Sequence, residues 1–231
     1  AGTLHVAAVS EREGELAVLK IRDETPQSPT DFLLLNLARA RADAIVTTGR
    51  ILREESEVTH ELQGSAPNRA ALREWRRELG LGAPPVLAVL TRGRDFAADH
   101  PAWSAEVRPV LFGPEGRTAE EIEATRSVAV AMPEGDGLRG VVAALRRSGC
   151  RRISIEAGPS SARGLYDPPV VVDELLLSVF HGAVPPAVVG RPFLAAGRLE
   201  AAFGAPAGRS ALGPDGWEFR HYRRFRAGRG R

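Results

Sequence analysis

The chain has 231 residues, 43% of them hydrophobic, and a formal net charge of +2, so its length fits one large domain or two small ones. Its one cysteine, Cys150, excludes an internal disulfide and fits a reducing, cytoplasmic setting. No apolar run reaches the roughly 18–20 residues that span a bilayer, and residues 1–5 lack the pattern of a signal peptide. We therefore expect a soluble, cytoplasmic protein without a membrane partner.

The N-terminal part of the chain predicts three strands and one helix. The strands are expected at 4–9, 16–21 and 44–48, and the helix at 29–42. The start of the helix is well marked, because Ser28 can accept hydrogen bonds from free amides, Pro29 suits the first helical position and Asp31 completes a capping box. Gly49 ends the third strand.

The middle of the chain alternates strands and helices. After a polar segment at 50–68 without a clear pattern, helices are predicted at 69–79, 118–125, 138–148 and 159–166, and strands at 86–91, 107–112, 128–131, 152–156 and 170–180. Alternation of this kind predicts a largely parallel sheet with helices on both faces. The C-terminal stretch, including 217–225, predicts antiparallel strands without helices. We expect one domain over residues 1–231, with the proline- and glycine-rich stretches as loops.

The C-terminus carries a basic run with interleaved aromatic residues at 221–226, followed by Arg229 and Arg231. Such a run can follow a nucleic-acid backbone. The alternation also fits a final strand followed by a disordered tail at about 226–231. The second interpretation is favoured, so no nucleic-acid partner is expected.

Several common sites are missing from the sequence. It has no phosphate-binding loop ending in Gly-Lys-Ser/Thr, no Gly-x-Gly-x-x-Gly after the first strand, and no His/Cys cluster at metal-ligand spacing. We therefore expect no metal site. Cys150 lies between a helix-ending glycine and a strand, which favours a core residue over a catalytic thiol.

Three strand ends have the character of a ligand site. They lie at 44–50 (AIVTTGR), 86–94 (VLAVLTRGR) and 153–160 (ISIEAGPS). Open α/β sheets bind ligands at the carboxyl ends of their strands, where hydroxyls, free amides and arginine forks suit phosphate groups. Each segment alone also fits an ordinary loop, but together they predict a nucleotide lying across one edge of the sheet.

An ordered set of short motifs resembles one known family. The motifs are LARARADAI at 37–45, the Gly49–Arg50 pair, LTR at 90–92, IEAGP at 155–159, VDELLL at 172–177 and GRPF at 190–193. In order and spacing they resemble the pyrimidine reductase domain of bacterial riboflavin biosynthesis. That domain belongs to the dihydrofolate-reductase-like superfamily.

The resemblance implies a dihydrofolate-reductase-like α/β fold and an NADPH-dependent reductase. The protein would pass hydride to a small, heterocyclic or carbonyl substrate. The cofactor residues that it implies are Thr48, Gly49, Arg50, Thr91, Arg92, Ala157, Gly158, Pro159 and Ser160. Glu156 is the candidate catalytic residue, with a helix-capping carboxylate as the alternative. Ser10 and Glu55 are candidate substrate contacts.

The sequence also departs from the family pattern. The family's first strand contains a Lys and reaches Ser-x-Asp-Gly, whereas residues 10–14 read SEREG here. The family's paired Asp region is replaced around 54–56 and 59–61, and Ala157 stands where the family has a first glycine. The motifs that the resemblance assigns to the cofactor are therefore better preserved than those that it assigns to the substrate. A non-catalytic NADP(H)-binding or regulatory protein is the alternative function.

Three further expectations follow from the resemblance. The Ala157–Gly158 peptide bond is expected to be cis, as the corresponding Gly-Gly bond is in dihydrofolate reductases. A homodimer is expected, because the family's reductase domains commonly pair through their C-terminal sheet region and the apolar strand at 170–180 would suit an uncovered edge; the alternative is that this strand is central and buried. NADPH should be preferred over NADH through Arg50 and Arg92, with Arg94 in reserve, unless these are solvated loop arginines.

Overall fold

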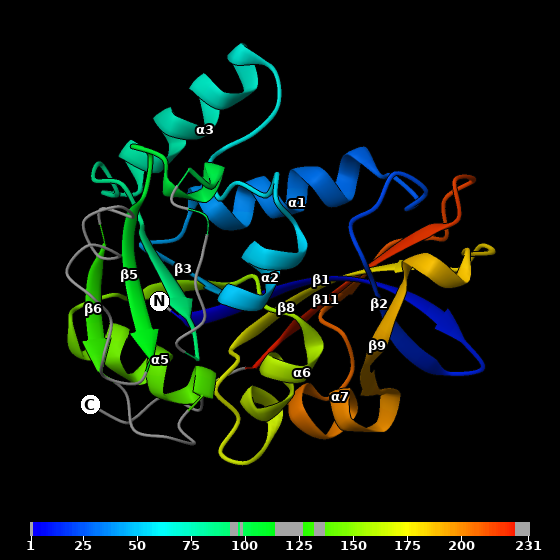
Figure 1. The fold of residues 1–231 in the computed structure, drawn as a ribbon. Helices are drawn as coiled ribbons and strands as arrows, with labels where there is room; N and C mark the ends of the chain where they lie inside the picture. Colours follow the sequence, from blue (N-terminus) through cyan, green and yellow to red (C-terminus); the bar gives the residue numbers. More distant parts are fainter. Residues whose placement is uncertain (1, 93–96, 98, 114–126, 132–136, 225–231) are drawn as a thin grey trace.

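A computed structural model describes residues 2–92, 97, 99–113, 127–131 and 137–224. Their strands join in one sheet, in the order β10-β11-β8-β1-β7-β3-β4-β5-β6, with β2 and β9 attached beside β1 (Figure 1). All neighbours from β8 to β6 along this order are parallel, while β11, β10, β2 and β9 pair antiparallel. The predicted mixed, mostly parallel sheet with antiparallel C-terminal strands is confirmed.

The strands lie close to their predicted positions in the first three quarters of the chain. Their bounds are β1 Gly2–Arg12, β2 Glu15–Leu19, β3 Ala44–Thr48, β4 Val86–Leu90, β5 Arg108–Gly113, β6 Val128–Ala131, β7 Arg152–Ile155, β8 Glu174–Phe180, β9 Val189–Ala195, β10 Gly208–Arg209 and β11 Trp217–Arg223. β3 and β6 match the predicted bounds, because each is a short apolar run between polar or glycine residues.

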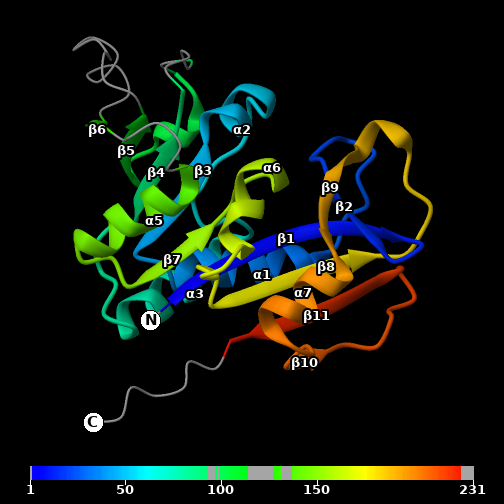
Figure 2. The same cartoon turned by 90° about the horizontal axis from the view of Figure 1, so that it is seen from below.

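Helices cover both faces of the sheet, as predicted. They are α1 Pro29–Ala40, α2 Gly49–Glu54, α3 Ala66–Glu78, α5 Gly137–Arg147, α6 Pro159–Ala162 and α7 Ala196–Phe203, with 3-10 turns η1 Pro101–Trp103, η2 Arg163–Tyr166 and η3 Pro186–Val188. Figures 1 and 2 show α1 and α3 on one face and α5, α6 and α7 on the other. Among the described residues, no helix combines the length and apolar character that crossing a bilayer requires.

The start of α1 follows the predicted chemistry. Ser28 Oγ accepts a hydrogen bond from the Asp31 amide at 3.3 Å, and Pro29 occupies the first turn. The helix ends at Ala40, two residues before the predicted end, because Arg41 leaves the helical conformation. Asp43 then anchors the chain, since its carboxylate accepts the amides of Arg151 and Arg152 at 2.7 and 3.0 Å.

The core lies on both faces of the central strands. Ile45 of β3 packs with Leu87, Trp103 and Leu111 on the face that carries α1 and α3. Val46, the next residue, points to the opposite face and belongs to the larger cluster around α5 and α7. Burying each such side chain stabilises the fold by about 1.5–3 kcal/mol, which is why β3 reads as a continuous apolar run.

The C-terminal region differs most from the prediction. The structure places α7 where only strands were expected, and β9 overlaps a segment that was expected to be a loop. Helix α7 forms because residues 196–203 are mostly good helix formers, Leu199 packs into the core, and Gly204 closes the helix with φ +75°. The helix predicted at 118–125 falls outside the described residues.

β8 is an internal strand rather than an edge. It pairs with β1 on one side and β11 on the other, and it begins at Glu174 rather than at residue 170. Residues just before it are held by other contacts, since the Asp173 amide donates to the Thr3 carbonyl at 2.8 Å. The uncovered edge that motivated the homodimer is therefore wrong, and the homodimer itself stays a prediction.

Candidate ligand-binding site at the carboxyl ends of the parallel strands

The fold brings the three predicted strand ends to one edge. β3 lies between β4 and β7, all three are parallel, and their registers pair Thr48 with Leu90 and Val46 with Ile155. The residues that follow each strand therefore emerge side by side. This is the edge where open α/β sheets bind ligands.

At the end of β3, the Thr48 hydroxyl caps a short helix. Thr48 Oγ1 accepts a hydrogen bond from the Ile51 amide at 3.4 Å, and Gly49 and Arg50 form the first turn of α2. The guanidinium of Arg50 pairs with Glu54 at 2.7 Å, and both side chains are more than half exposed. An exposed pair of this kind is weak, so Arg50 can exchange its partner for a ligand anion at little cost.

At the end of β4, Thr91 is buried and Arg92 is exposed. The Thr91 amide donates to the Phe112 carbonyl at 2.8 Å, which ties this strand end to β5. Gly113 allows β5 to lie this close to Thr91, because a Cβ on residue 113 would lie only 2.8 Å from the Thr91 carbonyl oxygen. Arg92 has no carboxylate partner within the described part of the chain. Arg94 lies outside the described residues.

The segment after β7 has a trans Ala157–Gly158 bond, so the predicted cis bond is wrong. Among the described residues, the only cis bond is Pro168–Pro169. A cis bond without proline costs about 2.5–4 kcal/mol, and with Ala157 in place of glycine the chain takes the ordinary trans form. Gly158 is extended, Pro159 starts α6, and Ser160 Oγ accepts from Arg191 at 3.3 Å.

Glu156 is held in a buried two-pronged ion pair with Arg39 of α1. Arg39 Nε lies 3.0 Å from Glu156 Oε1, and Arg39 Nη2 lies 2.7 Å from Oε2. The side chains are 4% and 10% exposed. Burial raises the pKa of Glu156, but the Arg39 guanidinium outweighs burial and holds the pKa below its usual value. Glu156 is therefore ionised, and it pairs with Arg39 rather than capping α6.

His60 lies against this ion pair and was not among the predicted site residues. Its Nε2 is 4.0 Å from Glu156 Oε2, and its side chain is 1% exposed. Burial lowers the pKa of His60 to about 4, so the imidazole is neutral at pH 7. Its Nδ1 has no hydrogen-bond partner among the described residues. No spacing motif could reveal this cluster, because its members come from distant parts of the chain.

On the other face of the sheet, His5 supports the Ala157 segment. His5 Nδ1 lies 2.6 Å from the Tyr166 hydroxyl, and the ring also hydrogen-bonds to the Ala157 backbone. Burial lowers the pKa of His5 to about 4 and raises that of Tyr166, so both groups are neutral. The neutral tautomer of His5 that is consistent with both contacts accepts a hydrogen bond from the Tyr166 hydroxyl and donates one to the Ala157 carbonyl. His5 thus fixes the backbone just before Gly158.

A second carboxyl group near this edge was assigned only to a helix cap. Burial raises the pKa of Asp31, and the nearby Ser178 hydroxyl opposes the rise. Ser178 Oγ is buried without a hydrogen bond of normal geometry among the described residues. The helix α1 runs from this end of β8 to the other, because Arg41 pairs with Glu174 at the start of β8 at 2.6 Å. Asp31 therefore lies toward the carboxyl edge.

The two predicted substrate contacts differ in their surroundings. Ser10 is buried, and its hydroxyl donates to the Ala17 carbonyl at 3.5 Å within the β1–β2 hairpin. Glu55 ends α2 and is partly exposed. Burial and the neighbouring Glu54 raise the pKa of Glu55 to about 6, against the opposing charge of Arg22. Glu55 thus joins Asp31 as a carboxyl group that holds its proton more readily than usual.

Fold and site together define a class: an α/β protein with a mostly parallel sheet and a polar site at the carboxyl ends of its strands. No protein-family model and no curated protein matches the sequence. Solved structures do match its fold. A pyrimidine reductase-like protein of Corynebacterium diphtheriae superposes with a TM-score of 0.70 at 22% identity, covering 97% of this chain and 92% of that one.

Two structures of riboflavin enzymes are similar as well. RibD of Acinetobacter baumannii matches with a TM-score of 0.64 at 12% identity, over 96% of this chain and 57% of its own length. The riboflavin biosynthesis reductase Rib7 of Saccharomyces cerevisiae matches with a TM-score of 0.58 at 10% identity, over 96% of this chain and 89% of that one. The present chain thus spans little more than half of RibD. At these identities the likeness shows that the chain shares the mixed α/β fold of these structures.

Proposed function

We propose that the protein is an NADPH-dependent reductase that transfers hydride to a small heterocyclic or carbonyl substrate. The observation that carries the proposal is the convergence of three strand ends, at Thr48, Thr91 and Glu156, on one edge. The fold shared with pyrimidine reductases supports the same assignment.

The residues at this edge fit a dinucleotide. No atom lies within 4 Å of the place where a Cβ on Gly158 would be, so a ligand can approach the backbone there. Arg92 is exposed without a carboxylate partner in the described ranges, and Arg50 is held only by an exposed pair. Two cations near the ends of adjacent strands suit the phosphate groups of NADPH, and the 2′-phosphate in particular.

NADPH, when bound, supplies the hydride, and the residues of this chain bind, orient and protonate. In the proposal, Gly158, Pro159 and Ser160 line the cofactor while His5 keeps the Ala157 backbone in place. Glu156 keeps its predicted role as a polar contact beside the reacting ring. Because Arg39 holds it ionised, Glu156 accepts hydrogen bonds from the substrate and does not donate a proton.

Asp31 is the stronger candidate for proton donation. A carboxyl group with a raised pKa retains its proton closer to neutral pH, which is the property that a general acid needs. The hydroxyl of its neighbour Ser178 has no hydrogen-bond partner among the described residues, so it can hydrogen-bond to the substrate or to Asp31. The cap of α1 is the Ser28 hydroxyl, which accepts from the amide of Asp31 and not from its side chain, so a change of the carboxyl group leaves the cap intact.

The test follows NADPH oxidation with a panel of heterocyclic and carbonyl substrates, with calorimetric titration of NADPH in parallel. For an active substrate, Asp31→Asn should lower kcat at least tenfold and remove the fall in activity on the alkaline side of its pH profile, while NADPH affinity is unchanged. Glu156→Gln should raise KM more than it lowers kcat. Arg198→Gln, at an exposed pair with Asp167 on the opposite face, is the control and should change neither.

The outcomes separate the two functions. Tight NADPH binding without oxidation of any substrate would support the non-catalytic NADP(H)-binding protein instead. Failure to bind NADPH would overturn both.

A further inference from the structure

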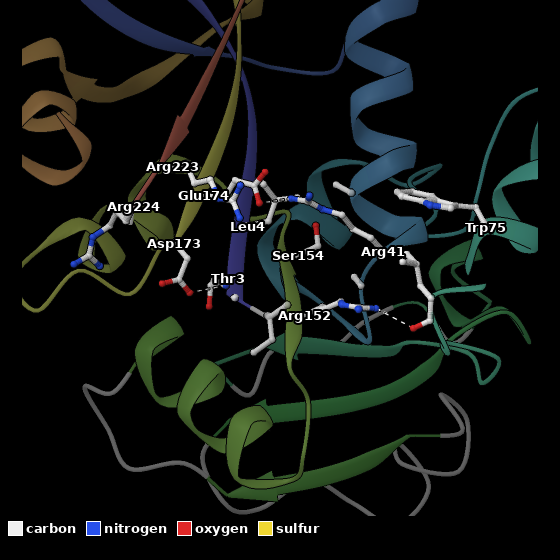
Figure 3. A pocket seen from close by; sticks show the side chains of 15 residues that line it. Thr3, Leu4, Arg41, Trp75, Arg152, Ser154, Asp173, Glu174, Arg223 and Arg224 are labelled. Carbon is white, nitrogen blue, oxygen red and sulfur yellow. Dashed lines mark hydrogen bonds and ion pairs between the residues drawn. The ribbon is translucent and has the colours of Figure 1, made fainter. Parts of the chain in front are cut away.

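A further cavity lies at the opposite edge of the sheet. It has a volume of about 450 Å³ and opens at the first residues of three parallel strands, β1, β7 and β8. The C-terminal end of α1 and one side of α3 complete its wall (Figure 3). None of the proposed cofactor residues lines it. Its volume lies in the range of small-molecule sites, which is about 300–1,000 Å³.

The charges around this cavity favour an anion. Its lining contains four arginines against two carboxylates. Both carboxylates are already engaged: Glu174 pairs with Arg41 at 2.6 Å and His221 at 2.9 Å, while Asp173 accepts the Thr3 amide at 2.9 Å and pairs with Arg146 at 3.3 Å.

The other arginines of the lining have no carboxylate partner among the described residues. Arg152 and Arg224 donate only to the backbone carbonyls of Leu79 and Val170, at 3.1 and 2.7 Å. Arg223 is exposed at the end of β11. Guanidinium groups that lack a carboxylate bind phosphate and carboxylate ligands through two parallel hydrogen bonds.

A second, independent observation concerns Ser154 of β7. Its side chain belongs to the cavity lining, and its Oγ is buried without any hydrogen-bond partner in the described structure. Figure 3 shows this hydroxyl in the middle of the lining residues. A buried hydroxyl without a partner is costly, so a serine at this place in the sheet fits a ligand that supplies the missing hydrogen bond.

One wall of the cavity is aromatic. Trp75 of α3 is partly exposed and lies at one end of the cavity, while Arg223 lies at the other, with Arg41 and Arg152 between them (Figure 3). Tryptophan offers the largest flat surface of any side chain, and planar rings stack on such a surface. The remaining wall is apolar, from Leu4, Leu79 and Ile153.

We propose that this cavity is a second binding site, for a small ligand that joins a planar ring to a phosphate or carboxylate group. The ring stacks on Trp75, the anion is held by Arg152 and Arg223, and an oxygen of the ligand meets Ser154. This site is independent of the proposed reductase activity, because it shares no residue with the carboxyl edge of the sheet.

A synthetic probe tests the two halves of the ligand separately. 1-Naphthyl phosphate carries both ring and anion, inorganic phosphate carries the anion alone, and 1-naphthol carries the ring alone. Calorimetric titration should show naphthyl phosphate binding at least tenfold more tightly than either half. Trp75 fluorescence should be quenched on binding, because Trp103 and Trp217 are buried at 5% and 2% exposure and lie outside the cavity.

Variants assign the binding to this cavity. Trp75→Ala should remove the advantage of the ring and leave phosphate affinity unchanged. Arg223→Gln should weaken both phosphate probes at least fivefold. Ser154→Ala should weaken them too, without lowering the stability of the free protein. Arg108→Gln is the matched control, since Arg108 is an exposed arginine at the start of β5 on the same edge but outside the cavity.

The proposal and the reductase assignment fail in different ways. Absence of naphthyl phosphate binding, or an equal loss with Arg108→Gln, overturns the second site. Displacement of the probe by saturating NADPH also overturns it, because that result places the probe at the carboxyl edge. If the protein does not bind NADPH at all, the reductase proposal fails while the titrations without NADPH still decide the second site.

Discussion

The two edges of the parallel sheet use charged side chains in opposite ways. At the carboxyl edge, the Arg39–Glu156 ion pair is buried, with side chains 4% and 10% exposed. At the amino edge, the Arg41–Glu174 pair is 33% and 22% exposed and opens onto a cavity. Both arginines belong to the end of α1, two residues apart, so one helix serves both arrangements.

The difference shows what burial does to an ion pair. A buried ion pair fixes the position of its carboxylate and keeps the carboxylate ionised, which suits a residue that must orient a ligand. A partly exposed pair is held more weakly and leaves neighbouring arginines free to bind an anion from solvent.

Arg39→Leu should destabilise the protein by about 3–5 kcal/mol, because it leaves the Glu156 carboxylate buried without its partner. Urea denaturation measures the loss. Arg39→Leu combined with Glu156→Leu should be less damaging than the single change, since no buried charge remains. Arg41→Leu at the partly exposed pair is the matched comparison and should cost no more than about 1 kcal/mol. Equal losses for Arg39 and Arg41 would remove the contrast between the edges.

Mild acid should destabilise the protein through two buried histidines. His5 and His60 have pKa values of about 4 in the folded state, against 6.5 in the unfolded chain. Between these values the unfolded state binds more protons, so stability is fully present above about pH 6.5 and is lost as the pH falls toward 4. Each histidine accounts for about 3 kcal/mol over this window.

Denaturation midpoints measured from pH 7.5 to 4.5 check this expectation. His60→Asn should remove roughly half of the slope, and a flat profile in wild type would contradict both assignments. Because His60 touches Glu156 and His5 touches the Ala157 segment, the effect reports the carboxyl edge specifically.

The local elements of the fold could be predicted where sequence pattern alone determines them. β3 and the start of α1 follow from a short apolar run and from Ser28, Pro29 and Asp31, each of which acts within its own segment. Helix α7 departs from the predicted C-terminal strands, although its composition and the Gly204 that follows it are typical of a helix.

The carboxyl edge was located from the sequence, but its charge network was not. The strand ends carry visible Thr, Gly and Arg residues, whereas the partner of Glu156 lies 117 residues away. The sequence predicts only a local role for Asp31 at the cap, because its neighbour Ser178 lies far along the chain and approaches it only in the folded structure. Long-range pairing of charges depends on topology, which spacing along the chain does not contain.

Two glycines at the carboxyl edge should respond differently to a methyl group. Gly113→Ala should destabilise the fold by about 1–3 kcal/mol, because its Cβ would lie 2.8 Å from the Thr91 carbonyl oxygen. Gly158→Ala should leave stability unchanged within about 0.5 kcal/mol, since no atom lies within 4 Å of its Cβ and its φ of −60° suits alanine.

For NADPH binding, we expect Gly158→Ala to have the larger effect of the two glycine variants. If NADPH approaches the Gly158 backbone, Gly158→Ala should weaken its binding at least tenfold in calorimetric titration, despite normal stability. Unchanged NADPH affinity in Gly158→Ala would mean that the open space beside this residue is not occupied by the cofactor.

The smallest expected effect concerns the choice between NADPH and NADH. The two cofactors differ only in the 2′-phosphate, and a charge-assisted hydrogen bond to such a group is worth roughly 1.5–3 kcal/mol, less where solvent screens it. Arg92 is exposed and has no carboxylate partner in the described ranges, whereas Arg50 must first leave Glu54. Arg92→Ala should therefore weaken NADPH binding at least several-fold and barely change NADH binding, with a smaller effect from Arg50→Ala.

Arg223→Gln is the control, because Arg223 is an exposed arginine of the amino edge, and it should change the binding of neither cofactor. Titration of both cofactors decides the matter: an equal loss for NADPH and NADH, or tight NADH binding by the unmodified protein, would show that these arginines do not recognise the 2′-phosphate. A loss in Arg223→Gln equal to that in Arg92→Ala would instead show that the two edges do not act as separate sites.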